Sequence, residues 1–374
     1  MTCDFLPLAA PGVRTLHPYQ PGKPESELRR EYGLSDIIKL ASNENPLGPS
    51  PKALVAVREA LAGVARYPDG NGFELKTALS ARLNTPIGAL TLGNGSNDVL
   101  ELAARAFLTP EHEAVFSEHA FAVYPIVTQA IGATARVAQA NPPDHPMPYG
   151  HDPAALLNLI NDRTRIVFIA NPNNPTGTWL KTAELQTLLE AVPERVMVVV
   201  DEAYGEYVEA TADCPNALHW LDRFPNLIIT RTFSKAYGLA GLRVGYAVSH
   251  PQVADLLNRV RQPFNVNSLA LVAATAALGD LEHLERSRTL NRAGMQQLQD
   301  ACRQWGLSWL PSVGNFLCVD VGRSGREMFL ELLKRGVIVR PVDNYGLPHF
   351  LRISIGSQAE NARLIEVLGT VLKD

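Results

Sequence analysis

The chain holds 374 residues, of which 46% are hydrophobic and 19% charged, with 27 Gly and 27 Pro. This composition is typical of a globular protein rather than a disordered or fibrous one, and the length suits two domains of about 100 to 200 residues each. Acidic and basic residues nearly balance, 38 against 34, which gives a formal net charge of -4. Because no basic excess draws the chain to nucleic acid or an anionic membrane, we expect it to bind any anion locally.

The N-terminal sequence lacks a basic start followed by a long apolar run, and no later segment reaches about 18 uninterrupted apolar residues. We therefore expect a cytoplasmic protein without a membrane partner. The four cysteines and nine histidines fall into no metal-ligand spacing such as C-x-x-C or H-E-x-x-H. We accordingly expect no metal site.

Short apolar runs alternate with helical patterns in the middle of the chain. Apart from Arg165 and Thr230 at their ends, residues 165–170, 196–200 and 227–230 are continuously apolar rather than alternating, which is typical of strands buried on both faces. Residues 181–191, between the first two runs, carry apolar side chains at helical spacing. This order predicts an α/β fold with a mostly parallel sheet flanked by helices.

The pattern changes toward the C-terminus. Residues 251–305 are mainly helical in pattern, and short strands then mix with helices, which indicates a smaller α+β unit. We predict a large domain over residues 46–280. The small domain is predicted to combine residues 281–374 with an N-terminal arm, residues 1–45.

Polar residues follow each of the three apolar runs. These are a turn-like cluster that contains Asn174, then Asp201 to Tyr204, then Arg231 to Lys235. Taken singly, they are ordinary features: a turn, a helix cap and a solvated lysine. Ligands of open α/β sheets, however, bind beyond the carboxyl ends of the strands. Three polar groups at one edge of one sheet therefore predict a joint site.

Together these residues resemble the fold-type I pyridoxal-phosphate aminotransferases. The pattern of that family, Ser-Lys followed eight residues later by Arg, is present as Ser234, Lys235 and Arg243. The resemblance implies that Lys235 binds pyridoxal 5′-phosphate as a Schiff base. It also implies that this lysine moves the proton between the substrate Cα and the cofactor. Such a lysine needs a lowered pKa, which burial can supply.

The resemblance also implies roles around the cofactor ring. Asp201 would keep the ring nitrogen protonated, because an adjacent anion raises the pKa of that nitrogen. Asn174 and Tyr204 would hydrogen-bond the phenolic oxygen of the ring, and Tyr124 corresponds to the aromatic residue that stacks on it. A half-buried tyrosine at a strand end is the alternative for Tyr124. We predict Lys235, Asp201 and Tyr204 as the catalytic residues.

A glycine-rich turn, residues 93–98, precedes a helical stretch, and backbone N–H groups at a helix start bind phosphate. A dinucleotide-binding fingerprint is the alternative, but its third glycine is missing and no acidic residue follows a second strand at the required distance. The sequence and the resemblance together predict a phosphate cup formed by Gly95, Ser96, Asn97, Thr232, Ser234 and Arg243.

Segments along nearly the whole chain are similar to the histidinol-phosphate aminotransferase family: residues 17–24, 40–49, 65–68, 336–341 and 346–356. The family reaction passes the amino group of glutamate to imidazole-acetol phosphate by a ping-pong mechanism, giving histidinol phosphate and 2-oxoglutarate in histidine biosynthesis. Guanidinium groups suit both carboxylates and phosphates. We therefore predict that Arg340, Arg352 and Tyr19 bind the substrate anions. An ion pair between the domains is the alternative for either arginine.

Three other functions stay open at this point: an aromatic amino-acid aminotransferase, a threonine-phosphate decarboxylase, and a transcription regulator built on an aminotransferase body. The regulator would need an added basic DNA-binding domain, yet the aminotransferase pattern already begins by Tyr19. The resemblance also implies a homodimer in which Tyr67 contacts the cofactor phosphate of the opposite subunit. Its Pro- and Gly-rich surroundings suit an exposed loop.

Overall fold

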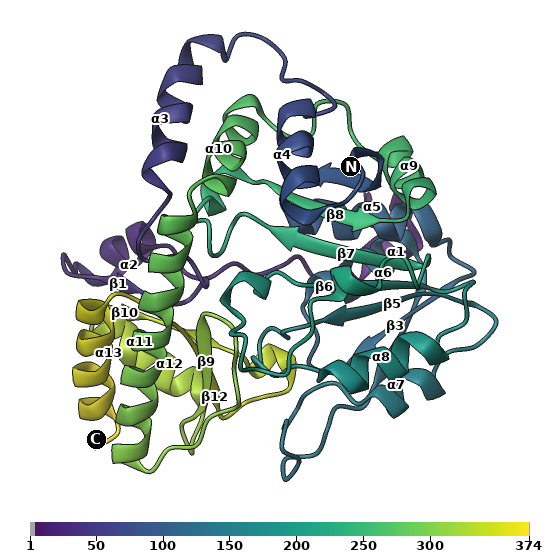
Figure 1. The fold of residues 1–374 in the computed structure, drawn as a ribbon. Coiled ribbons are helices and arrows are strands. Elements are labelled where there is room, and N and C mark those ends of the chain that lie inside the picture. Colours follow the sequence, from purple (N-terminus) through teal and green to yellow (C-terminus); the bar gives the residue numbers. More distant parts are fainter. Residues whose placement is uncertain (1–3, 374) are drawn as a thin grey trace.

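The computed structural model describes residues 4–373 and contains three sheets flanked by helices (Figure 1). Residues 1–3 and 374, which belong to the predicted small domain, lie outside the described residues. Within the described part, no helix is both long and apolar enough to cross a membrane.

The largest sheet has seven strands in the order β2-β8-β7-β6-β5-β3-β4. All run in one direction except β8, which is antiparallel to both of its neighbours. The predicted mostly parallel sheet is therefore confirmed. The bounds of its strands are β2 (Leu90–Gly93), β3 (Glu113–Ser117), β4 (Thr134–Ala138), β5 (Thr164–Ala170), β6 (Met197–Asp201), β7 (Leu227–Thr232) and β8 (Gly245–Ser249).

Helices cover both faces of this sheet, as the continuous apolar runs predict. On β5, Ile166 and Phe168 pack into one cluster, and Val167 and Ile169 pack into another on the opposite face. The first cluster includes α5 (Ser96–Phe107), α6 (Val123–Ile131) and α9 (Pro251–Val260). The second includes α7 (Pro153–Asn158) and α8 (Thr182–Ala191). A strand buried on both faces needs apolar side chains at every position.

A third cluster joins β2 and β8 to helices that lie at the top of Figure 1. These helices are α3 (Pro51–Ala60), α4 (Phe73–Leu83) and α10 (Ser268–Leu278). The remaining N-terminal helices are α1 (Pro11–Arg14) and α2 (Glu25–Tyr32).

The remaining strands form two small sheets. One is antiparallel, in the order β11 (Arg340–Pro341), β12 (Phe350–Ser354) and β9 (Phe316–Asp320). The other is a parallel pair of β1 (Ile38–Lys39) and β10 (Val337–Ile338). Helices α11 (Leu281–Trp305), α12 (Gly325–Lys334) and α13 (Gln358–Val371) pack against them. Every one of these strands lies outside residues 46–280; the exact domain boundaries stay a prediction.

Candidate active site

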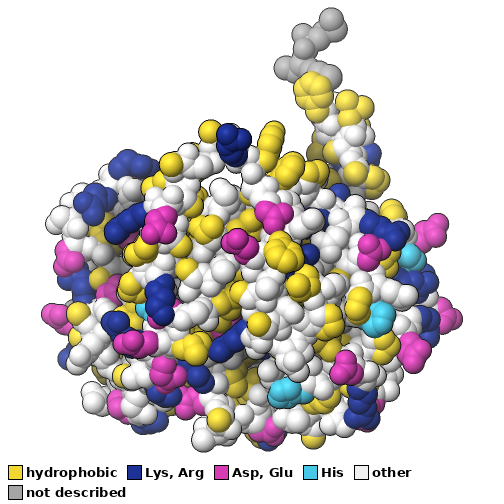
Figure 2. All heavy atoms as spheres, turned by 45° about the horizontal axis from the view of Figure 1, so that its top comes forward, with side chains coloured by type: hydrophobic (Ala, Val, Ile, Leu, Met, Phe, Trp, Pro, Cys, Tyr) yellow, Lys and Arg dark blue, Asp and Glu magenta, His cyan; other side chains and the backbone are white. Residues whose placement is uncertain are grey.

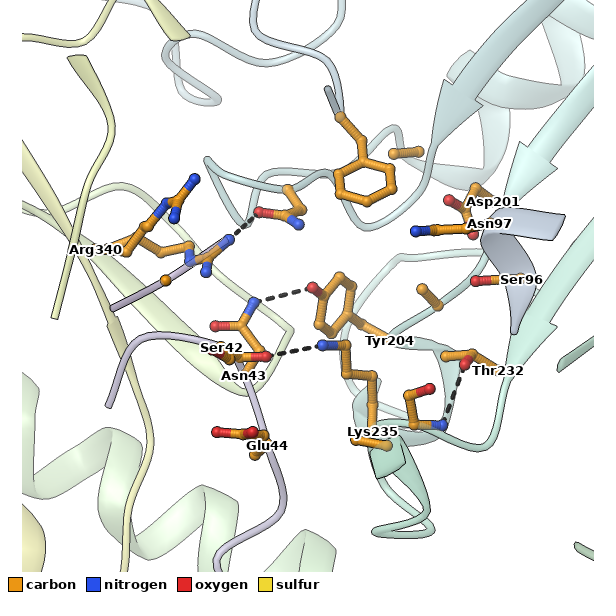
Figure 3. Close-up of a pocket in the computed structure, with 18 of the residues that line it drawn as sticks. Ser42, Asn43, Glu44, Ser96, Asn97, Asp201, Tyr204, Thr232, Lys235 and Arg340 are labelled. Carbon is orange, nitrogen blue, oxygen red and sulfur yellow. Dashed lines mark hydrogen bonds between the residues drawn. The ribbon is translucent and has the colours of Figure 1, made fainter. Parts of the chain in front are cut away.

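A cavity lies where the carboxyl ends of β5, β6 and β7 face β12 and the N-terminal segment (Figure 3). Most of the predicted site residues meet there, although they come from distant parts of the chain. The polar and aromatic residues that line the cavity are Tyr19, Ser42, Asn43, Glu44, Ser96, Asn97, Phe121, Asn174, Asp201, Tyr204, Thr232, Ser234, Lys235, Arg243, Arg340 and Arg352. Gly95, Tyr67 and Tyr124 are the predicted site residues outside this lining.

Lys235 lies just beyond the end of β7, and its Nζ donates a hydrogen bond to the main-chain oxygen of Ser42 at 2.9 Å. Burial lowers the pKa of this amine to about 7, and the positive charge of Arg352 adds to the effect. Glu44 acts in the opposite direction. Nζ also lies 5.8 Å from the centroid of the Tyr204 ring. The site therefore holds a lysine that is partly neutral near neutral pH.

Asp201 is the last residue of β6 and is only 4% exposed. Its Oδ1 accepts a hydrogen bond from Thr230 at 2.8 Å, and its Oδ2 accepts one from Tyr124 at 3.1 Å. Burial raises the pKa of this carboxyl to about 6. No Lys, Arg or His of residues 4–373 forms an ion pair with it. A buried carboxylate at a cavity wall without a cation fits a ligand that brings a positive charge.

The position of Tyr124 corrects the predicted stacking residue. Its side chain is fully buried, and its ring stacks on Phe168 at 4.9 Å rather than facing the cavity. The reason is local: α6 begins at Val123, so Tyr124 lies in the first helical turn and points into the core beneath the sheet edge. Phe121 precedes the helix and lines the cavity instead. Tyr124 donates its hydrogen bond to Asp201 from the core side, not from the cavity.

The residues predicted to form a phosphate cup lie around the start of α5. Gly95 has a φ of 86°, and a Cβ there would lie only 2.3 Å from Nη2 of Arg243. Glycine therefore lets the guanidinium approach the helix start, where the first N–H groups lack helical partners. Nη1 of Arg243 donates to Ser234 Oγ at 3.3 Å and to the main-chain oxygen of Ala240 at 3.0 Å. No carboxylate in the described part of the chain pairs with Arg243, which fits an anionic ligand.

Arg340 and Arg352 face each other across the β11–β12 ladder. Arg352 is 7% exposed and donates to Asn174 Oδ1 at 2.5 Å and to the main-chain oxygen of Ala41 at 2.6 Å. Its Nε is buried and makes no hydrogen bond. Arg340 donates to the main-chain oxygen of Gln20 at 2.8 Å. Neither arginine forms an ion pair with a carboxylate of residues 4–373, so the alternative of an ion pair between domains is not seen.

Several cavity residues were not among those predicted. Ser42, Asn43 and Glu44 follow β1 and enter the site from the N-terminal segment (Figure 3). Phe121, which precedes α6, also lines the cavity. Ser42, Asn43 and Glu44 lie in residues 40–49, a stretch that carries the family resemblance, so a signal for these three existed in the sequence. The polar residues at the strand ends drew the prediction to other positions. Tyr67 is 83% exposed and stacks on Phe264 at 4.7 Å, away from the cavity.

Comparisons with known proteins identify the family of this chain. A family model described as aminotransferase class I and II matches residues 35–368. The chain belongs to this family. It is 62% identical to histidinol-phosphate aminotransferase 2 of Pseudomonas fluorescens over 374 residues, which is 100% of this chain and 99% of that relative. It is 57% identical to histidinol-phosphate aminotransferase 1 of Nitrosococcus oceani, covering 99% of this chain and 98% of that relative.

Solved structures give the same picture of the fold. The chain superposes with a TM-score of 0.87 on histidinol-phosphate aminotransferase from Sinorhizobium meliloti in complex with pyridoxal-5′-phosphate, at 28% identity and 97% coverage of both chains. Aspartate aminotransferase from Thermus thermophilus with maleate superposes with a TM-score of 0.83 at 20% identity, covering 97% of this chain and 99% of that chain. The predicted family and the predicted fold class are both confirmed.

Proposed function

We propose that this aminotransferase transfers the amino group of glutamate to imidazole-acetol phosphate and so forms histidinol phosphate and 2-oxoglutarate. The observation that carries this proposal is the 62% identity, over the full length of both chains, to a histidinol-phosphate aminotransferase. The chemistry of the cavity supports it. Two guanidinium groups without carboxylate partners lie across from a buried lysine, and glutamate and the keto phosphate are both anions.

The cofactor in this proposal is pyridoxal 5′-phosphate. When bound, it supplies an electron sink for the carbanion that forms at the substrate Cα. The cup of Ser96, Asn97 and Arg243 holds its phosphate, because it combines free N–H groups with a positive charge. Asp201 would hold a proton on the ring nitrogen, since its carboxylate forms no ion pair with residues 4–373. Phe121 packs against the face of the ring.

Lys235 is the base in this proposal. Its lowered pKa leaves a neutral amine near neutral pH, which can take the proton from the substrate Cα and would deliver it to the cofactor. Asn174 and Tyr204 line the same cavity and orient the ring through hydrogen bonds to its oxygen. Arg352 and Arg340 hold the substrate anions. In a ping-pong reaction one site binds both substrates in turn, so the same arginines bind the carboxylate and the phosphate.

A substrate screen with glutamate as donor tests this assignment. Purified enzyme is assayed for 2-oxoglutarate with imidazole-acetol phosphate or phenylpyruvate as acceptor, and kcat/KM is compared. The proposal expects a strong preference for the phosphorylated acceptor, because a phosphate dianion offers more charge and more acceptor oxygens to the two arginines than the single carboxylate of phenylpyruvate does. A preference for phenylpyruvate would instead assign an aromatic aminotransferase. Release of carbon dioxide from threonine phosphate would assign a decarboxylase.

We further propose a cytoplasmic homodimer. The face that carries α3 and α4 exposes large apolar side chains (Figure 2), among them Leu54, Val55, Leu61, Val64 and Phe73. Tyr67 lies between these two helices in the chain. Exposed large apolar side chains gathered on one face are typical of an interface, and a second copy would bring Tyr67 toward the opposite phosphate cup.

A further inference from the structure

Hydrogen bonds from two side chains of the cavity hold the main chain of the loop after β1 at successive residues. The main-chain oxygen of Ala41 accepts a hydrogen bond from Arg352 at 2.6 Å. The main-chain oxygen of Ser42 accepts one from Lys235 at 2.9 Å. Asn43 follows directly and lies in the same view of the site (Figure 3). Its side chain is 1% exposed, and its φ of 54° is in the left-handed region, which asparagine tolerates better than most residues.

The side-chain amide of Asn43 has a defined orientation. Ser354 Oγ accepts the main-chain N–H of Asn43 at 2.7 Å and donates its own proton to Oδ1 of Asn43 at 2.9 Å. Because Oδ1 is the acceptor on that side, Nδ2 points the other way and donates to the hydroxyl of Tyr204 at 2.9 Å. The main-chain oxygen of Asn43 accepts from Asn315 at 3.0 Å. If the side-chain amide of Asn43 were rotated by half a turn, Nδ2 would take the place of Oδ1, and the hydroxyl proton of Ser354 would lose its acceptor.

This orientation matters for the proton of Tyr204. A phenol hydroxyl has one proton to donate and can also accept. Since Asn43 is the donor in their contact, the proton of Tyr204 is not used there. The hydroxyl makes no other hydrogen bond with residues 4–373, and the side chain is only 3% exposed. The cavity is therefore the place into which Tyr204 can donate.

We propose that Asn43 is a positioning residue for the aminotransferase reaction: by donating to the Tyr204 hydroxyl, it directs the proton of that hydroxyl to the ring oxygen of the cofactor. This inference rests on the proposed function. Donation to the ring oxygen stabilises its negative charge. The oxygen then holds the proton of the neighbouring Lys235–cofactor linkage less tightly, so the linkage loses that proton at a lower pH.

The same strand fixes both Asn43 and the substrate arginine. Ser354 and Arg352 are two residues apart on β12 and thus point to the same side of the sheet. Packing of β12 against the loop after β1 therefore sets the Asn43 amide. Asparagine suits this position because aspartate has no N–H to donate and would instead accept the proton of Tyr204.

The test is a pH titration of the holoenzyme, followed by the absorbance of the cofactor bound to Lys235. Four proteins are compared: wild type, Asn43→Gly, Tyr204→Phe and the double variant. Glycine accepts the left-handed backbone without strain. We expect Tyr204→Phe to raise the titration midpoint by about one pH unit, and Asn43→Gly to raise it by about half a unit to one unit. The double variant should match Tyr204→Phe alone, because Asn43 acts through Tyr204.

Asn291→Ala is the matched control. Asn291 is also buried and donates its amide to a main-chain oxygen, that of Gly314, at 3.1 Å. We expect its loss to leave the midpoint unchanged. If Asn43→Gly does not fold, as judged by its melting temperature, Asn43→Asp replaces it. If aspartate acts through Tyr204, Asn43→Asp should raise the titration midpoint when the Tyr204 hydroxyl is present and leave it unchanged in the Tyr204→Phe background. A rise caused only by the charge of the aspartate would occur in both backgrounds.

The outcomes distinguish a failure of the proposed function from a failure of the positioning role of Asn43. If borohydride reduction attaches no cofactor to Lys235 in the wild type, the proposed function fails. If the linkage forms but Asn43→Gly leaves the midpoint where it was, the positioning role is refuted. The role is also refuted if Asn43→Gly shifts the midpoint equally in the presence and absence of the Tyr204 hydroxyl.

Discussion

Lys235 combines burial with two nearby guanidinium groups, and both effects lower its pKa to about 7. An ordinary lysine titrates near pH 10.4, and only the neutral amine is nucleophilic. The rate at which the apoenzyme binds pyridoxal 5′-phosphate covalently should therefore rise with pH, with a midpoint near 7. Little further gain is expected above about pH 8.5. Stopped-flow absorbance measures the rate at each pH.

Peptide mapping after borohydride reduction identifies the lysine in the same experiment. We expect the adduct on Lys235, and we expect Lys235→Ala to abolish turnover while the phosphate cup still holds cofactor noncovalently. Lys52→Ala is the control, since the side chain of Lys52 is 63% exposed on α3. An adduct on another lysine, or a midpoint near 10, would show that the site is assigned to the wrong residue.

Asp201 is the second residue whose role can be tested singly. Asn in its place keeps the shape and can accept from one of the Thr230 and Tyr124 hydroxyls while its amide N–H faces the other, but it carries no negative charge to hold a proton on the ring nitrogen. We expect Asp201→Asn to fold and to lose activity on the order of ~10⁴-fold, as for other neutralised catalytic aspartates. Steady-state kinetics and a thermal melt measure both properties. Asp255→Asn is the control, because Asp255 forms an exposed ion pair with Arg259, and this variant should stay active. If Asp201→Asn turned over at a near-normal rate, Asp201 would be a purely structural residue.

The sequence predicted those site residues that follow the strands of the large sheet, because a strand end fixes where the next side chain lies. It did not predict Asn43, which meets Tyr204 only through a loop contact between residues 161 positions apart. It also chose Tyr124 over Phe121. Which of the two faces the cavity depends on where α6 begins, because Phe121 lies before the helix and Tyr124 lies in its first turn. The start of a helix is among the features that a sequence pattern defines least exactly.

At the level of elements, the start of α5 carries the phosphate cup, and its glycine can be tested. Gly95→Ala places a methyl group 2.3 Å from Arg243 Nη2 at a φ of 86°, so the guanidinium must move away. Charge-assisted hydrogen bonds contribute about 1.5 to 3 kcal/mol. We therefore expect the Kd for pyridoxal 5′-phosphate to rise about tenfold or more. Fluorescence titration of the apoenzyme measures it.

Gly88→Ala is the matched control, because a Cβ at Gly88 would meet no atom within 4 Å. This variant should bind cofactor like the wild type. Equal Kd values for Gly95→Ala and the wild type would mean that Arg243 tolerates the methyl group and that the cup does not depend on their close approach.

The elements themselves were predictable to different degrees. Strands β5, β6 and β7 and helix α8 are confirmed with small shifts at their ends. The strands were identified by continuous apolar runs and the helix by its apolar period, and each is long enough for its pattern to be recognised. The pairing of β1 with β10 could not be predicted. It joins Ile38 to Val337 through strands of two residues each, and so short a run carries no periodicity and no indication of its partner.

The cavity belongs to the whole molecule, because no single part of the chain forms it. The large sheet supplies Asp201 and Lys235, the small sheets supply Arg340 and Arg352, and the N-terminal segment supplies Tyr19. These polar groups come from segments that lie far apart in the sequence, and contacts between those segments position them. On the outside of the same molecule, the face with α3 and α4 remains apolar and exposed (Figure 2).

A shared-site homodimer gives that face a function and makes a definite prediction. Tyr67 is 83% exposed in a single chain and lies outside the cavity that the same chain forms. If it serves the opposite phosphate cup, mixing inactive Lys235→Ala chains with Tyr67→Ala chains should restore activity. In the mixed dimer one site collects both lesions and the other is intact, so turnover should exceed that of both parents. Native mass spectrometry confirms that subunits have exchanged. Should exchanged dimers stay as inactive as their parents, Tyr67 does not act across an interface, and the shared site is refuted even if the protein is a dimer.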